Sequence, residues 1–428
     1  MRFLFISLDA LATDPAWQVV REGHEARLFI ANKDENDIGD GFVEKSVNWK
    51  DDVDWADVIV FDDVLGQGRI AQKLRAEGRA VIGGTAYTDR LEDDRGFGQE
   101  ELKRHGVSIL SYETFTDLMD AVAYVRAHPA RYVIKPADPP KYKLFVGQEE
   151  DGSDVIRMLE AYHRVIRGKK GNGSTVQLQR YVSGVEVGVG AFFNGEDFIQ
   201  PININFEHKK LFPGNVGPAT GEMGTSMFWS APNKLFNATL KKFEATFREE
   251  RYVGYIDLNC IVNSNGIYPL EFTSRFGYPT IQIQNEALLM PLSEMFAKLA
   301  RGEGFSLRTK SGFAVGVRVV VPPFPYRDRK TFDAYSRGAT VVFKKPNRLE
   351  GIHIEDVKLV NGEWVVTGSA GTVLVVAGIG TTMAQAKAQA YSRIGNILVP
   401  NMYYRDDIGD RWAEDSDRLH NWGYLREQ

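Results

Sequence analysis

Short apolar runs alternate with amphipathic stretches along the first hundred residues. The runs are too short for helices, and the stretches between them carry apolar residues at helical spacing. This rhythm of strand, helix and strand predicts a parallel sheet covered by helices. The predicted strands span residues 2–7, 26–30, 57–61 and 80–82, and the predicted helices lie near 15–22 and 69–77.

Strand patterns become denser in the rest of the chain. Asn194-Gly195 and Asn265-Gly266 each separate two apolar runs, a pattern typical of β-hairpin turns. Thr116 or Asp117 is the predicted N-cap of a helix that ends at Ala127. The further predicted strands are 176–182, 185–193, 198–204, 255–262, 267–272 and 313–321, and the further helices are 234–248, 286–300 and 383–394.

Composition excludes several classes of protein. The 428 residues carry 52 basic and 57 acidic side chains, so the formal charge of -5 favours neither nucleic acid nor an anionic membrane as partner. The single cysteine, Cys260, allows no intrachain disulfide, which fits a reducing, cytoplasmic setting. No apolar stretch is long enough to span a membrane, and the N-terminus lacks the pattern of a signal peptide. We expect small-molecule substrates and a monomer or homodimer.

Two glycine-rich segments imitate nucleotide-binding motifs. Residues 66–71, GQGRIA, match a dinucleotide-binding pattern but do not follow the first predicted strand, so we interpret them as a turn before a helix. Residues 168–175, GKKGNGST, have Ser174 where a P-loop needs lysine. We interpret Cys260 as a core residue of a buried strand.

Four other stretches make chemical sense together. Lys135 and Lys143 stand at the two ends of a loop, KPADPPKYK, after a predicted strand. The other stretches are QRYVSGVE (179–186), HKKLFPGNVGPATGEMG (208–224), and Asn259 with EFTSRFG (271–277) across a predicted hairpin. A nucleoside triphosphate needs cations at its phosphates and a carboxylate for its ribose, and Mg²⁺ prefers one or two carboxylates plus phosphate oxygens. The set therefore predicts a site for a nucleoside triphosphate and Mg²⁺.

These residues carry a resemblance to the ATP-grasp family, within it to the phosphoribosylamine–glycine ligases (glycinamide ribonucleotide synthetases). The segment LEDDRGFGQEELKRHGVSILSYETF (91–115) is similar to the run before that family's ATP domain, with Arg95 at a lysine position. GPATGEMG resembles G-P-N-T-G-G-M-G, and EFTSRFGYP resembles E-F-N-x-R-F-G-D-P. Near the end, MYYRDDIGDR (402–411) resembles Y-Y-R-x-D-I-G.

The resemblance implies the architecture. The fold class is α/β, multidomain, with an N-terminal βαβ domain (1–108), an ATP-grasp domain (109–310) and a strand-rich C-terminal domain (311–428). Within the second, residues 115–182 would form the small ATP subdomain. ATP would phosphorylate a carboxylate, and an amine would attack the acyl phosphate to form an amide, with Mg²⁺ or Mn²⁺ as metal.

The resemblance also implies roles for individual residues. Lys135, Lys143 and Arg95 would bind ATP, the adenine would lie along residues Gln179, Arg180, Tyr181 and Val182, and Glu186 would hold the ribose. Lys209 with His208 would approach the terminal phosphate, and Arg275 would meet the transferred phosphoryl group. The metal ligands would be Glu271, Asn259 and Thr273, and the substrate site would be lined by Thr220, Gly221, Gly224 and Arg275.

The chain departs from the family pattern where the other substrates should bind. The first strand leads into SLDALATDPAW (7–17) instead of G-N-G-G-R-E-H, and Pro139-Pro140 replaces glycine in the lysine loop. Glu222 adds a charge, and Tyr278 stands at an aspartate position. Three hypotheses follow: a ligase with diverged substrates, an authentic glycinamide ribonucleotide synthetase of purine biosynthesis, and a non-catalytic nucleotide-binding relative.

Overall fold

The computed structural model describes residues 1–136, 144–166 and 175–425. Two compact units divide the chain. The larger unit contains Met1–Val107, Val185–Cys260 and Leu270–Gln428, and the smaller contains Ser108–Gly184 and Ile261–Pro269. None of the described helices is long and apolar enough to cross a membrane.

A five-stranded parallel sheet with flanking helices forms the N-terminal part of the larger unit, which confirms the βαβ prediction. Phe3, Leu4 and Phe5 are wholly buried, as in a parallel sheet covered on both faces. The strand order is β3-β2-β1-β4-β5, with β1 (Arg2–Ser7), β2 (Glu25–Ile30), β3 (Glu44–Lys45), β4 (Val58–Phe61) and β5 (Val81–Ile82). The helices are α1 (Thr13–Arg21), α2 (Gln67–Ala76), α3 (Ala86–Asp93) and α4 (Arg95–Arg104), with 3₁₀ turns at Lys33–Glu35 and Trp49–Asp52.

The GQGRIA segment is the turn into α2, as interpreted from the sequence. Gly66 has φ 88° at the helix N-cap, a conformation that glycine adopts without a steric penalty. The Asp89 carboxylate accepts hydrogen bonds from the amides of Gly68 (2.9 Å) and Gly66 (3.2 Å). The first amides of α2 are therefore already occupied by a carboxylate of the chain itself.

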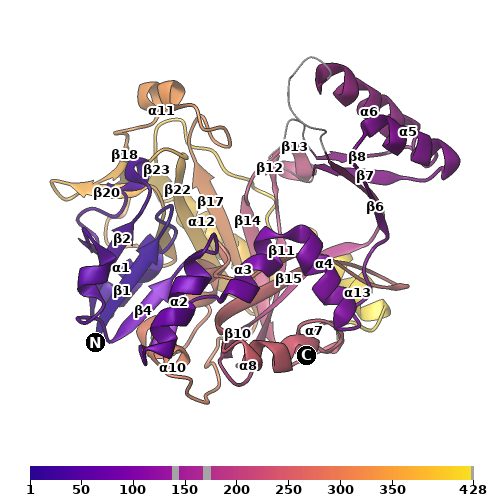
Figure 1. Cartoon of the computed structure of the whole chain (residues 1–428). Coiled ribbons are helices and arrows are strands. Elements are labelled where there is room, and N and C mark those ends of the chain that lie inside the picture. Colours follow the sequence, from indigo (N-terminus) through magenta and orange to yellow (C-terminus); the bar gives the residue numbers. More distant parts are fainter. Residues whose placement is uncertain (137–143, 167–174, 426–428) are drawn as a thin grey trace. The chain divides into compact units, whose positions relative to one another are not determined.

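An eight-stranded sheet has the order β16-β15-β10-β11-β14-β17-β22-β19. Figure 1 labels six of its strands, β10, β11, β14, β15, β17 and β22. Strands of the predicted C-terminal domain belong to it, because β14 pairs with β17 from Gly224↔Val317 to Phe228↔Phe313. The strands are β10 (Val185–Asn194), β11 (Ile202–Glu207), β14 (Gly224–Ser230), β15 (Val253–Asn263), β16 (Gly266–Thr273), β17 (Phe313–Val320), β19 (Ile352–Ile354) and β22 (Thr372–Gly380).

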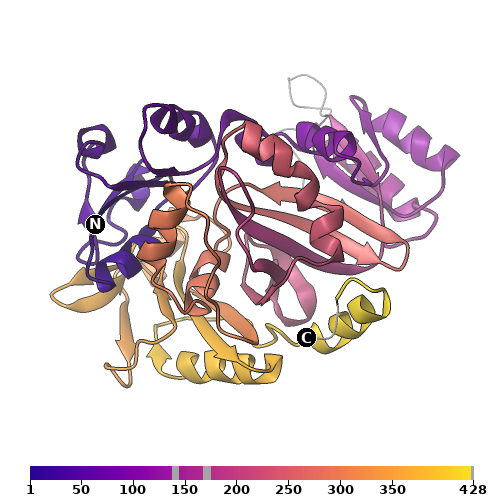
Figure 2. The ribbon, with the colours of Figure 1, turned by 90° about the horizontal axis from the view of Figure 1, so that it is seen from below.

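C-terminal strands also lie against the N-terminal sheet. The amide of Gly39 donates to the carbonyl of Val357 (2.8 Å), and the amide of Leu359 donates to that of Asp40 (2.8 Å). Figure 2 shows these indigo and orange segments side by side. The remaining strands of the unit are β12 (Lys210–Phe212), β13 (Val216–Ala219), β18 (Thr340–Phe343), β20 (Val357–Val360), β21 (Glu363–Val366) and β23 (Ile397–Leu398).

Two predicted helices were wrong in extent. The helix predicted over 234–248 is broken into α7 (Lys234–Ala238), a 3₁₀ turn (Leu240–Phe243) and α8 (Glu244–Glu249). Thr239 has non-helical angles of φ −127° and ψ −99° there. The helix predicted over 286–300 is the end of α9 (Thr280–Glu286) followed by α10 (Leu292–Ala300). The others are α11 (Arg329–Tyr335), α12 (Met383–Ile394), as predicted, and α13 (Trp412–Asn421), with a 3₁₀ turn at Pro213–Asn215.

The smaller unit is a four-stranded antiparallel sheet, ordered β6-β9-β7-β8, with two helices. Asp117 caps its first helix by accepting a hydrogen bond from the amide of Met119 (2.7 Å), as one of the two predicted caps. The elements are β6 (Tyr112–Phe115), α5 (Leu118–Ala127), β7 (Tyr132–Pro136), β8 (Phe145–Val146), α6 (Ser153–Ile166) and β9 (Val176–Arg180).

Candidate active site

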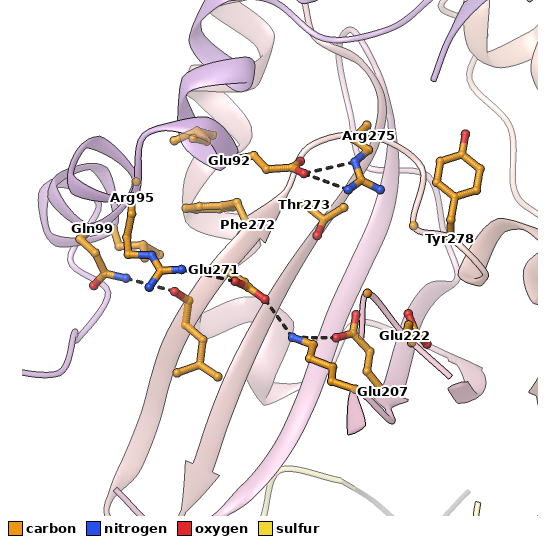
Figure 3. Close-up of a pocket in the computed structure, with 17 residues that line it drawn as sticks. Glu92, Arg95, Gln99, Glu207, Glu222, Glu271, Phe272, Thr273, Arg275 and Tyr278 are labelled. Atoms are coloured by element: carbon orange, nitrogen blue, oxygen red, sulfur yellow. Dashed lines mark hydrogen bonds and ion pairs between the residues drawn. The ribbon is translucent and has the colours of Figure 1, made fainter. Parts of the chain in front are cut away.

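A cavity of about 300 Å³ opens in the larger unit among α3, α4, the end of β11 and β16 (Figure 3). Both acidic and basic side chains face it, so the cavity can hold groups of either charge. Its lining residues are Leu91, Glu92, Arg95, Gly98, Gln99, Leu102, Glu207, Lys209, Gly221, Glu222, Leu270, Glu271, Phe272, Thr273, Arg275, Gly277 and Tyr278.

Lys209 is surrounded by three carboxylates. Its Nζ lies 2.8 Å from Glu271 Oε1, 3.0 Å from Glu207 Oε2 and 3.6 Å from Glu186 Oε1. Burial by itself would lower the pKa of the Lys209 amine, but these carboxylates raise it well above its usual value. Burial raises the pKa of Glu207, and Lys209 partly offsets that effect. The amine is therefore charged and acts as the cation of an acidic cluster.

Asn259 lies beside this cluster on β15. Its Nδ2 donates to Glu186 Oε1 (2.8 Å) and to Glu207 Oε2 (3.5 Å). The other end of the amide is a carbonyl oxygen, a group that Mg²⁺ accepts as ligand. No group of three or more His, Cys, Asp or Glu side chains is arranged to hold a metal ion within residues 1–136, 144–166 and 175–425. The residues present thus suit an ion that also takes ligands from a bound phosphate.

Arg275 is held at another part of the cavity by Glu92 and Asp63. Its Nε and Nη2 each lie 3.2 Å from Glu92 Oε1, and its Nε lies 3.5 Å from Asp63 Oδ1. Glu92 also accepts the amide of Ser274 (2.7 Å), which fixes the chain next to the guanidinium. Burial would lower the pKa of Arg275, but Glu92 and Asp63 raise it. The arginine is a fixed positive charge at the cavity wall.

Helix α4 brings Arg95 to the outer side of the cluster. Arg95 Nη2 lies 3.9 Å from Glu271 Oε2, and Gln99 Nε2 donates to the carbonyl of Leu270 (3.5 Å; Figure 3). Glu271 thus lies between two cations, Lys209 and Arg95. Glu271 lines the cavity near the end of strand β16, and the sequence predicted a metal ligand at this position.

His208 does not line this cavity, although the sequence paired it with Lys209. Only 1% of the residue is exposed, and neither ring nitrogen has a hydrogen-bond partner among the described residues. Burial and the nearby charges of Arg411 and Arg405 lower the pKa of His208 to about 3. Neighbouring side chains on an extended segment point to opposite sides, which explains why Lys209 lines the cavity and His208 does not. The role of His208 at a phosphate stays a prediction.

The segment after His208 doubles back on itself. Thr220 donates to the carbonyl of Lys209 through its amide (2.7 Å) and its hydroxyl (2.9 Å). Gly224 has φ 156°, and a Cβ there would lie 2.5 Å from the carbonyl oxygen of Gly316, so only glycine fits. Gly221 lines the cavity, with open space where a side chain would stand.

Residues 93–281 match the model of the phosphoribosylglycinamide synthetase ATP-grasp (A) domain. This part of the chain is similar to an ATP-grasp domain. Among the curated relatives, the phosphoribosylamine–glycine ligase of Streptococcus pneumoniae (strain R6) is 28% identical over 377 residues, which cover 84% of each chain. The corresponding ligase of Halalkalibacterium halodurans is 26% identical over 359 residues, covering 80% of this chain and 79% of the relative.

Solved structures show the same fold. The phosphoribosylamine–glycine ligase of Thermotoga maritima superimposes with a TM-score of 0.70 at 21% identity, covering 95% of this chain and all of that chain (100%). The phosphoribosylglycinamide synthetase of Anaerococcus prevotii has a TM-score of 0.61 at 12% identity, covering 93% and 98%. The predicted ATP-grasp fold and the resemblance are thereby confirmed.

The smaller unit contains Lys135 and the residues predicted to lie along the adenine, Gln179, Arg180, Tyr181 and Val182. Lys135 lies on β7 with 8% exposure, and Gln179 lies on the neighbouring strand β9 with 3% exposure. The Arg131 guanidinium stacks 3.5 Å from the ring centre of Tyr181. Lys143 and the prolines near it lie outside the described residues. The roles of these residues, with Arg180 and Val182, stay predictions.

The sequence missed three acidic residues of the site: Glu207, Glu92 and Asp63. Glu207 was detectable, because it stands two residues before Lys209 and so shares its face on an extended strand. Glu92 and Asp63 gave no such signal. They are far from Arg275 in sequence, and they meet it only where α3 and the end of β4 approach the segment after β16.

Proposed function

We propose that this ATP-grasp protein is an ATP-dependent ligase that joins a carboxylate to an amine through an acyl phosphate. The observation that carries the proposal is the cavity in which Lys209 and Arg95 flank Glu271 and Arg275 lines another part of the wall. Phosphoryl transfer to a carboxylate needs fixed positive charges more than a covalent catalyst. The cavity-lining residues include neither histidine nor cysteine, in keeping with that chemistry.

Lys209 and Arg275 are the proposed catalytic cations. Lys209 would leave its present carboxylates and contact the terminal phosphate, since a more negative partner becomes available when ATP binds. Arg275 is already held in place by Glu92 and Asp63 and would contact the transferred phosphoryl group. The substrate would lie against Thr220, Gly221 and Gly224, and Glu186 would hold the ribose.

The same cavity suits Mg²⁺ with ATP. Glu271, the amide oxygen of Asn259 and the Thr273 hydroxyl would hold the ion, which bridges and neutralises phosphate oxygens when bound. Lys209 Nζ at 2.8 Å from Glu271 Oε1 shows that this carboxylate position already attracts a cation. Manganese would suit the same oxygen ligands.

The names of the relatives favour a narrower candidate, with glycine as the carboxylate and phosphoribosylamine as the amine. The residues at the end of β1 argue against glycine and phosphoribosylamine as the substrates. There the buried Asp62 carboxyl accepts the Ser7 hydroxyl and the amide of Ala12 (2.8 Å), at the start of α1. Burial raises the pKa of Asp62 to about 7. A substrate phosphate at this helix start would have to displace a carboxyl group of the chain.

Release of ADP across pairs of amino acids and amines tests the proposal. Turnover with a pair other than glycine and phosphoribosylamine, without rescue of a purine auxotroph, would support a diverged ligase. Turnover with that pair and rescue would support the narrower candidate. Binding of ATP without ADP release from any pair would contradict both and favour a non-catalytic relative.

A further inference from the structure

Glu222 is a cavity carboxyl to which the reaction proposed above gives no role. It lines the cavity, only 5% of the residue is exposed, and its Oε1 has no hydrogen-bond partner among the described residues. In the signature that the sequence resembles, glycine stands at this position. A buried carboxyl oxygen without a partner is costly, so a ligand group that hydrogen-bonds to Glu222 Oε1 would remove this cost when it binds.

The backbone around Glu222 fixes where its side chain points. Its carbonyl accepts a hydrogen bond from Arg318 Nη1 (2.7 Å), and the next amide, of Met223, donates to the carbonyl of His208 (2.9 Å). Met223 itself is wholly buried, at 0% exposure. The carboxyl therefore points into the cavity, where Figure 3 shows it beside Glu207.

The cations near Glu222 already have carboxylate partners. Arg318 forms ion-paired hydrogen bonds with Glu355 at 2.7, 2.9 and 3.1 Å. Lys209 pairs with Glu271 and Glu207. The groups that act electrostatically on Glu222 are Glu207, Arg318, Lys209 and Asp257. Both cations near Glu222 are thus already paired with other carboxylates, and this end of the cavity suits a positively charged ligand.

We propose that Glu222 is a specificity residue whose carboxylate pairs with the ammonium group of a substrate. The inference rests on the proposed function and names the chemistry that one of its two substrates must carry. The ammonium can belong to an amino acid that supplies the carboxylate or to the amine that attacks it. A neutral or anionic group at this position would leave Glu222 unpaired.

Proton release provides a separate signature of the pairing. Burial raises the pKa of Glu222 well above its usual value, and Glu207 and Asp257 add to the effect, against Arg318 and Lys209. An ammonium group close to the carboxyl would lower that pKa again, because it favours the charged form. Binding of an ammonium ligand should then release a proton, which calorimetry in buffers of different ionisation enthalpy measures.

The test compares ammonium ligands with hydroxyl analogues of equal size, on the full chain with Mg²⁺ and a non-hydrolysable ATP analogue. Glycine against glycolate probes the carboxylate substrate, and glycinamide against glycolamide probes the amine. In the wild type, at least one ammonium ligand should bind about tenfold more tightly than its analogue, the size of one charge-assisted hydrogen bond. Glu222→Gln should reduce this ratio to about one and abolish proton release, and the affected pair identifies the substrate.

An unchanged ratio in Glu222→Gln, or no preference for ammonium in the wild type, would overturn the inference. Glu222→Gly provides a second variant if the glutamine does not fold, and Glu100→Gln, an exposed position on α4, is the matched control. If no substrate pair releases ADP while the ratio still depends on Glu222, the ligase proposal fails and the ammonium site remains.

Discussion

At the scale of residues, the site is a balance of charges that a local pattern reveals only in part. The sequence identified Glu271, Lys209 and Arg275 because each stands in a recognisable run. It could not show that Lys209 binds Glu271, since residues 62 positions apart meet only through folding. Nor could it show that His208 lies outside the cavity lining and that burial, with the nearby charges of Arg411 and Arg405, lowers its pKa.

Glu271→Gln tests the metal assignment. The substitution keeps the shape of the side chain but removes the charge that would bind Mg²⁺, so metal-dependent ADP release should fall by about a hundredfold or more. The thermal midpoint should change little, because 47% of the side chain is exposed. Glu303→Gln is the control, with 46% exposure. Wild-type activity in Glu271→Gln would show that the metal is held elsewhere.

Lys209→Met tests the acidic cluster through its pH dependence. The pKa of Lys209 is raised in the folded protein, so its stabilising charge is fully present below its ordinary value near 10.4. Without it, Glu207, whose pKa burial already raises, would lie beside Glu186 and Glu271 with no cation between them, and protonation at lower pH relieves that repulsion. We expect a loss in unfolding free energy of about 1–3 kcal/mol at pH 8, and less at pH 5.

Urea denaturation at the two pH values measures this difference. Lys298→Met is the matched control, because Lys298 pairs with Glu294 (3.1 Å) on the surface of α10. An equal loss at pH 5 and pH 8 would mean that Lys209 stabilises the fold by packing and not by neutralising the carboxylates.

At the scale of elements, prediction succeeded where one local signal decided the outcome. The helix Met383–Ile394 has its predicted bounds, and Asp117 caps α5. The helix predicted over 234–248 failed because its apolar spacing continues through Thr239, whose hydroxyl instead bonds to the carbonyl of Leu235 (2.6 Å). Apolar periodicity records which side is buried and does not reveal such a break.

The segment 402–411 is an element whose role the structure explains. Arg405, with 1% exposure, donates to both oxygens of Asp407 (2.7 and 2.6 Å) and to the carbonyl of Lys210 (2.9 Å). Asp407 in turn accepts the amide of Gly214 (2.9 Å). The C-terminal segment therefore holds the turn between β12 and β13 in place, and this turn precedes the glycines proposed to line the substrate site.

Arg405→Met should loosen this turn. It removes a buried cation and leaves Asp407 and the Lys210 carbonyl without that partner, so unfolding free energy should fall by about 2–4 kcal/mol at pH 7. Despite burial, Arg405 and Gly214 bring the pKa of Asp407 to about 2. The stabilisation from the charged Asp407 is present above the ordinary aspartate pKa near 3.9 and is lost towards pH 2. The loss of unfolding free energy caused by Arg405→Met should therefore be smaller at pH 3 than at pH 7.

Chemical denaturation at pH 7 and pH 3 checks this expectation. Arg418→Met, which breaks only an exposed ion pair with Glu414 on α13, should cost less than about 1 kcal/mol. An equally small effect of Arg405→Met would show that the 402–411 segment does not support the turn.

At the scale of the whole molecule, the sequence predicted the fold class, and it resembled the same ligases to which the comparisons find the chain similar. The pairing of β14 with β17 was out of reach, because strand partners distant in sequence are selected by packing that neither segment specifies alone. For the same reason the C-terminal strands of the eight-stranded sheet could not be assigned to the larger unit in advance.

The central claim is that the charged cavity of this protein, which has the ATP-grasp fold, performs ligation. Its most direct test is ADP release by the purified full chain with MgATP, across pairs of amino acids and amines, beside Glu271→Gln. The account predicts ADP and amide in equal amounts for at least one pair in the wild type and none above background in the variant. ADP formation that is independent of both substrates, or its absence with every pair while ATP still binds, would contradict the account.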